Sequence, residues 1–349
     1  MLLVLCSFLF IVIVTSYNNL IPKRLTLTSL LDSKNGLSPR KSLFFDIIEA
    51  GLEDKFGVMN DNNPTMTRIS KWLKFAKNEI ELPKPTVPYH EYIEEYIVGL
   101  TSQPWWHNDN IDNLKLFEWI KPLEESNEII KAELEKVLEV SESFKGDSKY
   151  MKTMGEGWQA IRLQRMGEWN EMNSLLFPKT VRIITGLQIP LAVRGVMFAK
   201  QKPRSGVAPH SDGRNFILTA HLGVKIPKEN EKVWMKVGGI EQKWNDGQVL
   251  VFDTSFTHET FNDTDEDRYV LIIDFWHPDL SKKERAALEY IYDARNKFEN
   301  NAIKEITSSY ISSGNPININ DYLKSKEGLG KSFVDFFQDG GLIKFNPFK

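Results

Sequence analysis

Apolar and polar positions in the first half of the chain follow a helical pattern. Residues 43–82 are weakly amphipathic at helical spacing. Prolines at positions 83, 85 and 88 then predict an extended break, because proline and the residue before it disfavour helix. A second helix is predicted from Pro122, which is tolerated in a first turn, to Val140. Its apolar face consists of Leu123, Ile129, Ile130, Leu134, Val137 and Leu138.

From about Trp158 the pattern changes to short β-rich runs separated by Gly and Asp/Asn turns. Several short strands without helices between them predict a sandwich or jelly roll rather than a parallel α/β sheet. After Pro278 a helical pattern returns over Lys282–Phe298. The predicted strands are Val196–Lys200, Asn215–Val224, Lys232–Val237, Gln248–Asp253 and Arg268–Trp276.

The start of the chain is unusually apolar. The run Leu2–Val14 is interrupted only by Ser7 and is shorter than the roughly 20 residues of a membrane-spanning helix. It fits the apolar part of a secretory signal, with an uncleaved anchor as the alternative. Residues 17–42 are basic, with Asp32 as their single acid, which fits either a flexible linker or a transit-like segment.

Composition excludes several classes of function. The chain has 349 residues, 41% hydrophobic and 26% charged, as expected for a globular protein with a core. A net charge of -3 and the lack of a basic motif disfavour nucleic-acid binding. The single cysteine is Cys6, which excludes intramolecular disulfides, Fe–S clusters and thiolate zinc sites.

These patterns predict a mainly β core with flanking helices and five segments along the chain. Residues 1–16 are the signal peptide or anchor, and 17–42 the linker or transit-like segment. The others are a helical N-terminal region (43–150), the β domain (151–285) and a helical C-terminal tail (286–349).

A candidate metal site comes from His210, Asp212 and His258. Residues i and i+2 of a strand point to the same face, so His210 and Asp212 share one cavity if they are extended. His258 follows a predicted strand and closes the site from a neighbouring one. Two imidazoles and one carboxylate on one face of an octahedron suit Fe(II) oxygenases. The alternative is a surface turn with a structural histidine.

Arg268 supplies a second piece of chemistry. It opens the predicted strand Arg268–Trp276, where alternation places it on one face with Val270 and Ile272. A guanidinium on an apolar face is costly without a partner. The distal carboxylate of 2-oxoglutarate is one such partner, since arginine binds carboxylates as a fork. A salt bridge with Asp267 or Asp274 is the alternative.

Five stretches of the chain match one known family in order and spacing: Gly99–Trp106, Pro209–Asp212, Ala220–Pro227, Trp244–Glu259 and Arg268–Pro278. In these stretches the chain resembles the aspartyl/asparaginyl β-hydroxylase domain family. The resemblance covers roughly residues 98–285.

The resemblance implies a double-stranded β-helix (jelly roll), Fe(II), 2-oxoglutarate and O₂. It makes His210 and His258 iron ligands, with Asp212 completing the triad, and assigns Arg268 to the cosubstrate. His221 matches a family histidine near the cosubstrate, with a structural role as the alternative. The implied reaction is hydroxylation of a C–H bond with release of succinate and CO₂, the β-carbon of Asp or Asn in a protein or peptide being one candidate position.

The resemblance leaves the substrate open. Animal members carry an arginine at the position of Thr219, so a peptide, a lipid and a small metabolite all stay as substrate classes. Trp105 and Trp106 are expected in the core rather than in a substrate groove. A secretory location, in the endoplasmic reticulum lumen or membrane, follows from residues 2–15, with the plastid as the alternative.

Two other functions compete with hydroxylation. One is a non-catalytic β-sandwich that binds a carboxylated ligand or glycan. The other is a zinc hydrolase with the same ligands, which needs a general base. Glu259 is adjacent to His258 but should point away from the metal on a strand.

Overall fold

The computed structural model describes 35–59 except 38, 64–81, 87–90, 95–106, 115–140, 144, 155 and 157–296. These residues form two compact units, one from residues up to 82 together with those from 281 on, the other from 83 to 280. The five segments predicted from the sequence are a finer division that these units do not test. The predicted signal or anchor (1–16) and the tail beyond 296 lie outside the described residues.

The first unit is helical, as the spacing over residues 43–82 predicts. It contains α2 (Pro39–Phe56), the short η2 (Pro64–Met66), α3 (Thr67–Ala76) and helical residues 282–296. Arg68 binds the buried Glu284 as a fork, with Nε and Nη2 donating over 2.7 and 2.6 Å. None of the described helices is long and apolar enough to cross a membrane.

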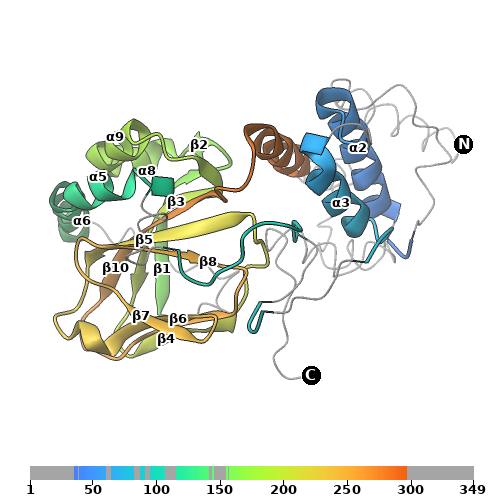
Figure 1. The fold of residues 1–349 in the computed structure, drawn as a ribbon. Coiled ribbons are helices and arrows are strands. Elements are labelled where there is room, and N and C mark those ends of the chain that lie inside the picture. The colour runs from blue at the N-terminus through green and yellow to red at the C-terminus, as the bar shows by residue number, and fades with distance from the viewer. Residues whose placement is uncertain are drawn as a thin grey trace, which may run out of the picture. The chain divides into compact units, whose positions relative to one another are not determined.

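The second unit is built from two antiparallel sheets (Figure 1). The larger has the order β2 (Glu168–Trp169), β1 (Trp158–Arg165), β3 (Leu191–Gln201), β10 (Arg268–Trp276), β5 (Ile217–Lys225) and β8 (Val249–Asp253). The smaller has the order β4 (Ser205–His210), β9 (His258–Asn262), β6 (Val233–Val237) and β7 (Ile240–Lys243). This is the jelly roll that the sequence predicts.

Strand alternation builds one core on each face of the larger sheet. On β10, Val270 and Ile272 point toward the smaller sheet, where they pack with Met235 of β6. Leu271 and Ile273 point the other way and pack with the helices. All nine residues of β10 are buried, because both faces of this strand are covered.

Four α-helices lie in the described part of the second unit: α5 (Ile120–Glu125), α6 (Asn127–Val140), α8 (Glu171–Leu176) and α9 (Pro178–Gly186). The single helix predicted from Pro122 is wrong, because the segment breaks at Ser126. The Ser126 hydroxyl donates to the Pro122 carbonyl over 2.8 Å. Ile129, predicted on the apolar face, is 48% exposed.

The start of α9 is capped from another helix. Its N-cap residue, Phe177, has no side chain that accepts a hydrogen bond. Glu133 of α6 takes this role, accepting from the backbone N–H groups of Lys179 and Thr180 at 2.8 Å each. A carboxylate at this position also offsets the positive end of the helix dipole.

The tryptophans of the matching segment are core residues, as expected. Trp105 is 4% exposed and packs between the sheets, and its indole N–H donates to the Ile240 carbonyl over 3.0 Å. Trp106 is 2% exposed and packs on the helical side.

Candidate metal centre

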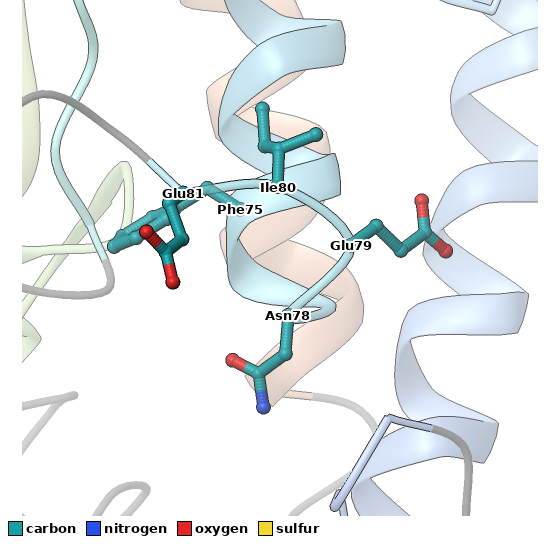
Figure 2. Close-up of a pocket in the computed structure, with 5 residues that line it drawn as sticks. All are labelled: Phe75, Asn78, Glu79, Ile80 and Glu81. Atoms are coloured by element: carbon teal, nitrogen blue, oxygen red, sulfur yellow. The ribbon is translucent and has the colours of Figure 1, made fainter.

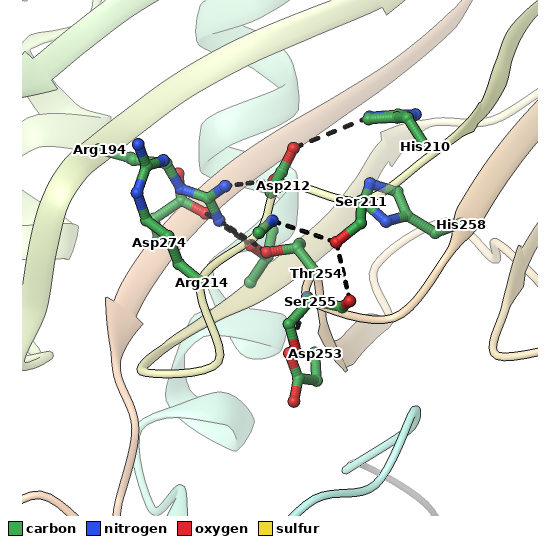
Figure 3. A network of polar contacts seen from close by, with 12 residues as sticks. Arg194, His210, Ser211, Asp212, Arg214, Asp253, Thr254, Ser255, His258 and Asp274 are labelled. Atoms are coloured by element: carbon green, nitrogen blue, oxygen red, sulfur yellow. Dashed lines mark hydrogen bonds and ion pairs between the residues drawn. The ribbon is translucent and has the colours of Figure 1, made fainter. Parts of the chain in front are cut away.

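Strands β4 and β9 place two histidines opposite each other. His210, the last residue of β4, pairs directly with His258, the first residue of β9. Their ring centroids are 4.2 Å apart. Asp212 follows β4, and its backbone N–H donates to the Thr254 carbonyl over 2.9 Å. One ligand atom of each of the three residues lies within 4.8 Å of the others (Figure 3).

Hydrogen bonds fix which ring nitrogen faces this space. Nδ1 of His210 lies 2.8 Å from the carbonyl of Ala208, and Nδ1 of His258 lies 2.9 Å from that of Phe256. A carbonyl only accepts, so each Nδ1 carries a proton, and Nε2 is the ring nitrogen left for another partner. Nε2 of His210 is buried and lies 3.7 Å from Oδ1 of Asp212, and no described residue forms a hydrogen bond with it. Histidines that bind metals commonly donate their other ring N–H to a carbonyl in this way.

The charge states suit a cation. Burial, followed by the proximity of His210, lowers the pKa of His258 to about 4, so its imidazole is neutral at pH 7. Burial works to raise the pKa of Asp212, but the charge of Arg194 and the two histidines outweigh it and hold that pKa far below its usual range. The site therefore offers a neutral imidazole on His258 and a carboxylate on Asp212, with the His210 ring beside them.

Arg194 of β3 is part of the site, although it was not predicted as a site residue from the sequence. Its Nη1 donates to Oδ2 of Asp212. Its Nη2 lies 2.9 Å from Oδ1 of Asp274, 2.9 Å from Oγ1 of Thr219 and 3.1 Å from Oγ1 of Thr254. The available signal was a charged residue followed by glycine within an apolar strand, Leu191–Gln201.

Arg268 lies on the inner face of β10, as alternation predicts. It is 2% exposed, and its guanidinium carbon is 4.3 Å from the centre of the Trp244 ring. Nε and Nη1 are buried and have no hydrogen-bond partner among the described residues. Burial lowers the pKa of Arg268 to about 9.

The acids that were alternative partners for Arg268 are engaged elsewhere. Asp267 pairs with Lys200 at 2.7 Å, and Asp274 pairs with Arg194 at 2.9 Å. The salt-bridge alternative for Arg268 is therefore wrong.

His221 of β5 lies close enough to Arg268 and to His258 for both to affect its charge state. Its ring is parallel to Trp244 at 6.0 Å and perpendicular to Phe252 at 4.8 Å. Burial and the nearby charge of Arg268 lower its pKa well below the usual value, so the ring is neutral. Its Nδ1 is buried, and none of the residues that the structure describes forms a hydrogen bond with it.

Residues that neighbour the site in sequence have structural contacts. Oδ1 of Asp253 accepts from the Ser255 N–H over 2.8 Å and from its hydroxyl over 2.6 Å, which shapes the loop that leads to His258. His277 is fully buried, with Nε2 3.0 Å from the Thr101 carbonyl. Glu259 pairs with Lys236, with Oε1 of the glutamate 3.5 Å from Nζ of the lysine.

A pocket in the first unit lacks such convergence. It follows α3 and is lined by Phe75, Asn78, Glu79, Ile80 and Glu81. Figure 2 shows the polar side chains of this pocket pointing in different directions. It offers no group of ligands comparable with the histidines and the aspartate.

Comparison with known proteins identifies relatives of this chain. The sequence pattern of the family "Aspartyl/Asparaginyl beta-hydroxylase" matches residues 124–278. The mouse aspartyl/asparaginyl β-hydroxylase is 30% identical over 196 residues, which is 55% of this chain and 26% of that protein. The ornithine lipid ester-linked acyl 2-hydroxylase of Rhizobium tropici is 32% identical over 179 residues, 49% of this chain and 62% of that protein.

Among solved structures, a prolyl hydroxylase from Trichoplax adhaerens in complex with a peptide of hypoxia inducible factor has a TM-score of 0.35 and 13% identity. The alignment covers 51% of this chain and 96% of that one. The chain spans about a quarter of the mouse relative's length, so the match concerns one domain. Over residues 124–278 this chain is therefore similar to the aspartyl/asparaginyl β-hydroxylase family.

Proposed function

We propose that this chain is an Fe(II)- and 2-oxoglutarate-dependent hydroxylase. His210, Asp212 and His258 would hold the iron, and Arg268 would bind the distal carboxylate of 2-oxoglutarate. One observation carries the proposal: a buried arginine with unsatisfied Nε and Nη1 lies in the same inter-sheet core as a cluster of two histidines and an aspartate.

The residues present fit this metal and cosubstrate. Two imidazoles and one carboxylate leave open coordination positions, which Fe(II) oxygenases use for cosubstrate and O₂. Nε2 of His210 and Nε of Arg268 are buried polar atoms that need partners, a cation and an anion respectively. The bound iron and 2-oxoglutarate would supply oxidative decarboxylation to succinate and CO₂, coupled to hydroxylation of a substrate C–H bond.

The chain's own contribution is binding, orientation and exclusion of water. The backbone carbonyls of Ala208 and Phe256 hold the imidazole rings in one orientation. Trp244 covers the guanidinium of Arg268 and keeps it dry, which strengthens its pairing with a carboxylate. We propose that His221 completes the cosubstrate site through its unsatisfied Nδ1.

The competing zinc hydrolase has no support from Glu259. A general base must lie beside the metal-bound water. Glu259 instead approaches Lys236, and its side chain is 30% exposed.

For the substrate, we propose a C–H bond in a protein or peptide, a lipid or a small metabolite. The mouse relative is named for aspartyl and asparaginyl residues, and the Rhizobium relative for an acyl chain. At position 219 this chain has a threonine whose hydroxyl binds Asp274 over 2.6 Å. We further propose a secretory location and membrane association through residues 2–15, a segment outside the described residues.

The test is succinate formation by the full chain from 2-oxoglutarate, Fe(II), ascorbate and air, without added substrate. We expect slow turnover that is lost in His258→Ala and Arg268→Met. The matched control is Arg204→Met, which removes an exposed arginine that pairs with Asp263 and Asp265. Fe(II) and 2-oxoglutarate binding are measured on the same samples. If the wild type binds neither, the oxygenase proposal fails and a ligand-binding sandwich takes its place.

A further inference from the structure

We propose that Arg194 is a positioning residue that holds Asp212 in the geometry for metal binding. This inference rests on the proposed function, since it concerns the same metal centre. It assigns a role to a side chain on β3, a strand that carries none of the three candidate ligands.

The first step concerns the two oxygens of Asp212. Oδ2 accepts from Nη1 of Arg194, and Oδ1 faces Nε2 of His210 at 3.7 Å. One oxygen is therefore anchored while the other is directed toward the histidines. A carboxylate held in this way binds a cation through a single, fixed oxygen.

The second step concerns what holds Arg194. Its Nη2 lies within 3.1 Å of three acceptors, on Thr219 of β5, Asp274 of β10 and Thr254 of the loop before His258. These three residues are almost fully buried. Asp274 also accepts from the Thr219 hydroxyl over 2.6 Å, so the anchor is itself cross-linked.

The third step concerns why Arg194 points inward. Met197 and Ala199 face the inter-sheet core, while Val196 and Phe198 face the helices. Strict alternation would send residue 194 to the helical side. The pairing of β3 with β10 is irregular here, however. Ile273 of β10 pairs with Val196 and Phe275 pairs with Leu191, so β3 has extra residues between these two pairs. This irregularity, with Gly195 at a φ of +79°, turns Arg194 to the side of the metal ligands.

The test is a double-mutant cycle in which Co(II) alone is the probe and its Kd is measured by calorimetry. The four proteins are wild type, Arg194→Met, Asp212→Ala and the double variant. We expect Arg194→Met to weaken Co(II) binding by about 10- to 100-fold, the usual effect of removing a partner of a metal ligand. With Asp212 already absent, the same change should alter Kd by less than about twofold, because Arg194 then has nothing to position.

Two further variants keep the cycle decisive. Arg204→Met controls for the loss of an arginine at an exposed site. Arg194→Lys retains the charge and replaces Arg194→Met in both backgrounds if the methionine variant does not fold.

Each outcome of the cycle has a separate meaning. An equal loss of affinity with and without Asp212 would show that Arg194 only supports the fold, and would overturn the inference. Unchanged binding in Arg194→Met would overturn it too. No Co(II) or Fe(II) binding by wild type would instead contradict the proposed function.

Discussion

At the scale of single residues, Asp253 combines full burial with an incomplete set of partners. Oδ1 accepts both hydrogen bonds from Ser255, and Oδ2 is buried without one. Burial raises the pKa of Asp253 from 3.8 to about 7, against the hydrogen bonds from Ser255, which lower it. The folded protein therefore retains a proton here that the unfolded chain releases near pH 3.8.

This difference predicts a pH dependence of stability. Because the pKa of Asp253 is higher in the folded protein, its protonation contributes to the free energy of unfolding. This contribution is complete below pH 3.8 and is lost as the pH rises through 7. Between pH 5 and pH 8 we expect the ionisation of Asp253 to lower the free energy of unfolding by about 2–3 kcal/mol. Urea unfolding at the two pH values should show this loss as the difference between wild type and Asp253→Asn, because the buried histidines, whose pKa values are lowered, change the stability of both proteins equally. Asp265→Asn, at an 88% exposed side chain, should behave as wild type; equal pH dependence in all three would contradict the assignment.

At the scale of elements, the irregularity of β3 depends on one glycine. A Cβ on Gly195 would lie 2.1 Å from the backbone oxygen of Gln164, and its φ of +79° disfavours other residues. We expect Gly195→Ala to lower the free energy of unfolding by about 1–3 kcal/mol, the range for backbone strain at a fixed position. Urea denaturation measures the change.

The matched control is Gly186→Ala near the end of α9. An added Cβ there meets no atom within 4 Å, and alanine favours helix. We expect no loss of stability in this variant. If the two variants were equally stable, the strand irregularity would not require glycine.

Prediction of strands succeeded where the apolar runs were nearly continuous. The runs Arg268–Trp276 and Gln248–Asp253 appear as β10 and β8, because apolar residues there fill positions buried on both faces. The strands β4 and β9 were not predicted. They are short and polar, and pairing with each other and with β6 supplies what their composition does not.

At the scale of the whole molecule, the candidate site belongs to one of the two units. His210, Asp212, His258 and Arg268 all lie between residues 83 and 280. A ligand at 100 times its Kd stabilises the folded state that binds it by about 2.7 kcal/mol. Fe(II) with 2-oxoglutarate should therefore slow hydrogen exchange in the strands of this unit.

The helices of the other unit provide an internal comparison. Exchange in α2, α3 and residues 282–296 should change less, since no residue proposed to bind these ligands lies there. Mass spectrometry of exchanged peptides, with zinc in place of iron to avoid oxidation, measures both units in one experiment. Uniform protection along the chain would show that the units unfold together.

The sequence by itself determined the fold class and the three candidate metal ligands. Apolar runs between turn signals predict the strands, His210 and Asp212 lie two residues apart, and His258 follows the predicted strand Gln248–Asp253. His210, Asp212 and His258 lie together in space as that argument expects. Their role as ligands stays a prediction until metal binding is measured.

Only the tertiary structure decided the partners of these residues. Arg194 reaches Asp212 because β3 departs from regular pairing. Arg268 has no acid beside it among the described residues, since Asp267 pairs with Lys200 and Asp274, six residues further along β10, pairs with Arg194. Glu133 caps a helix that begins at Pro178. Such contacts join residues far apart in the chain, and whether a charge is paired or left for a ligand depends on which strands meet, which local spacing does not specify.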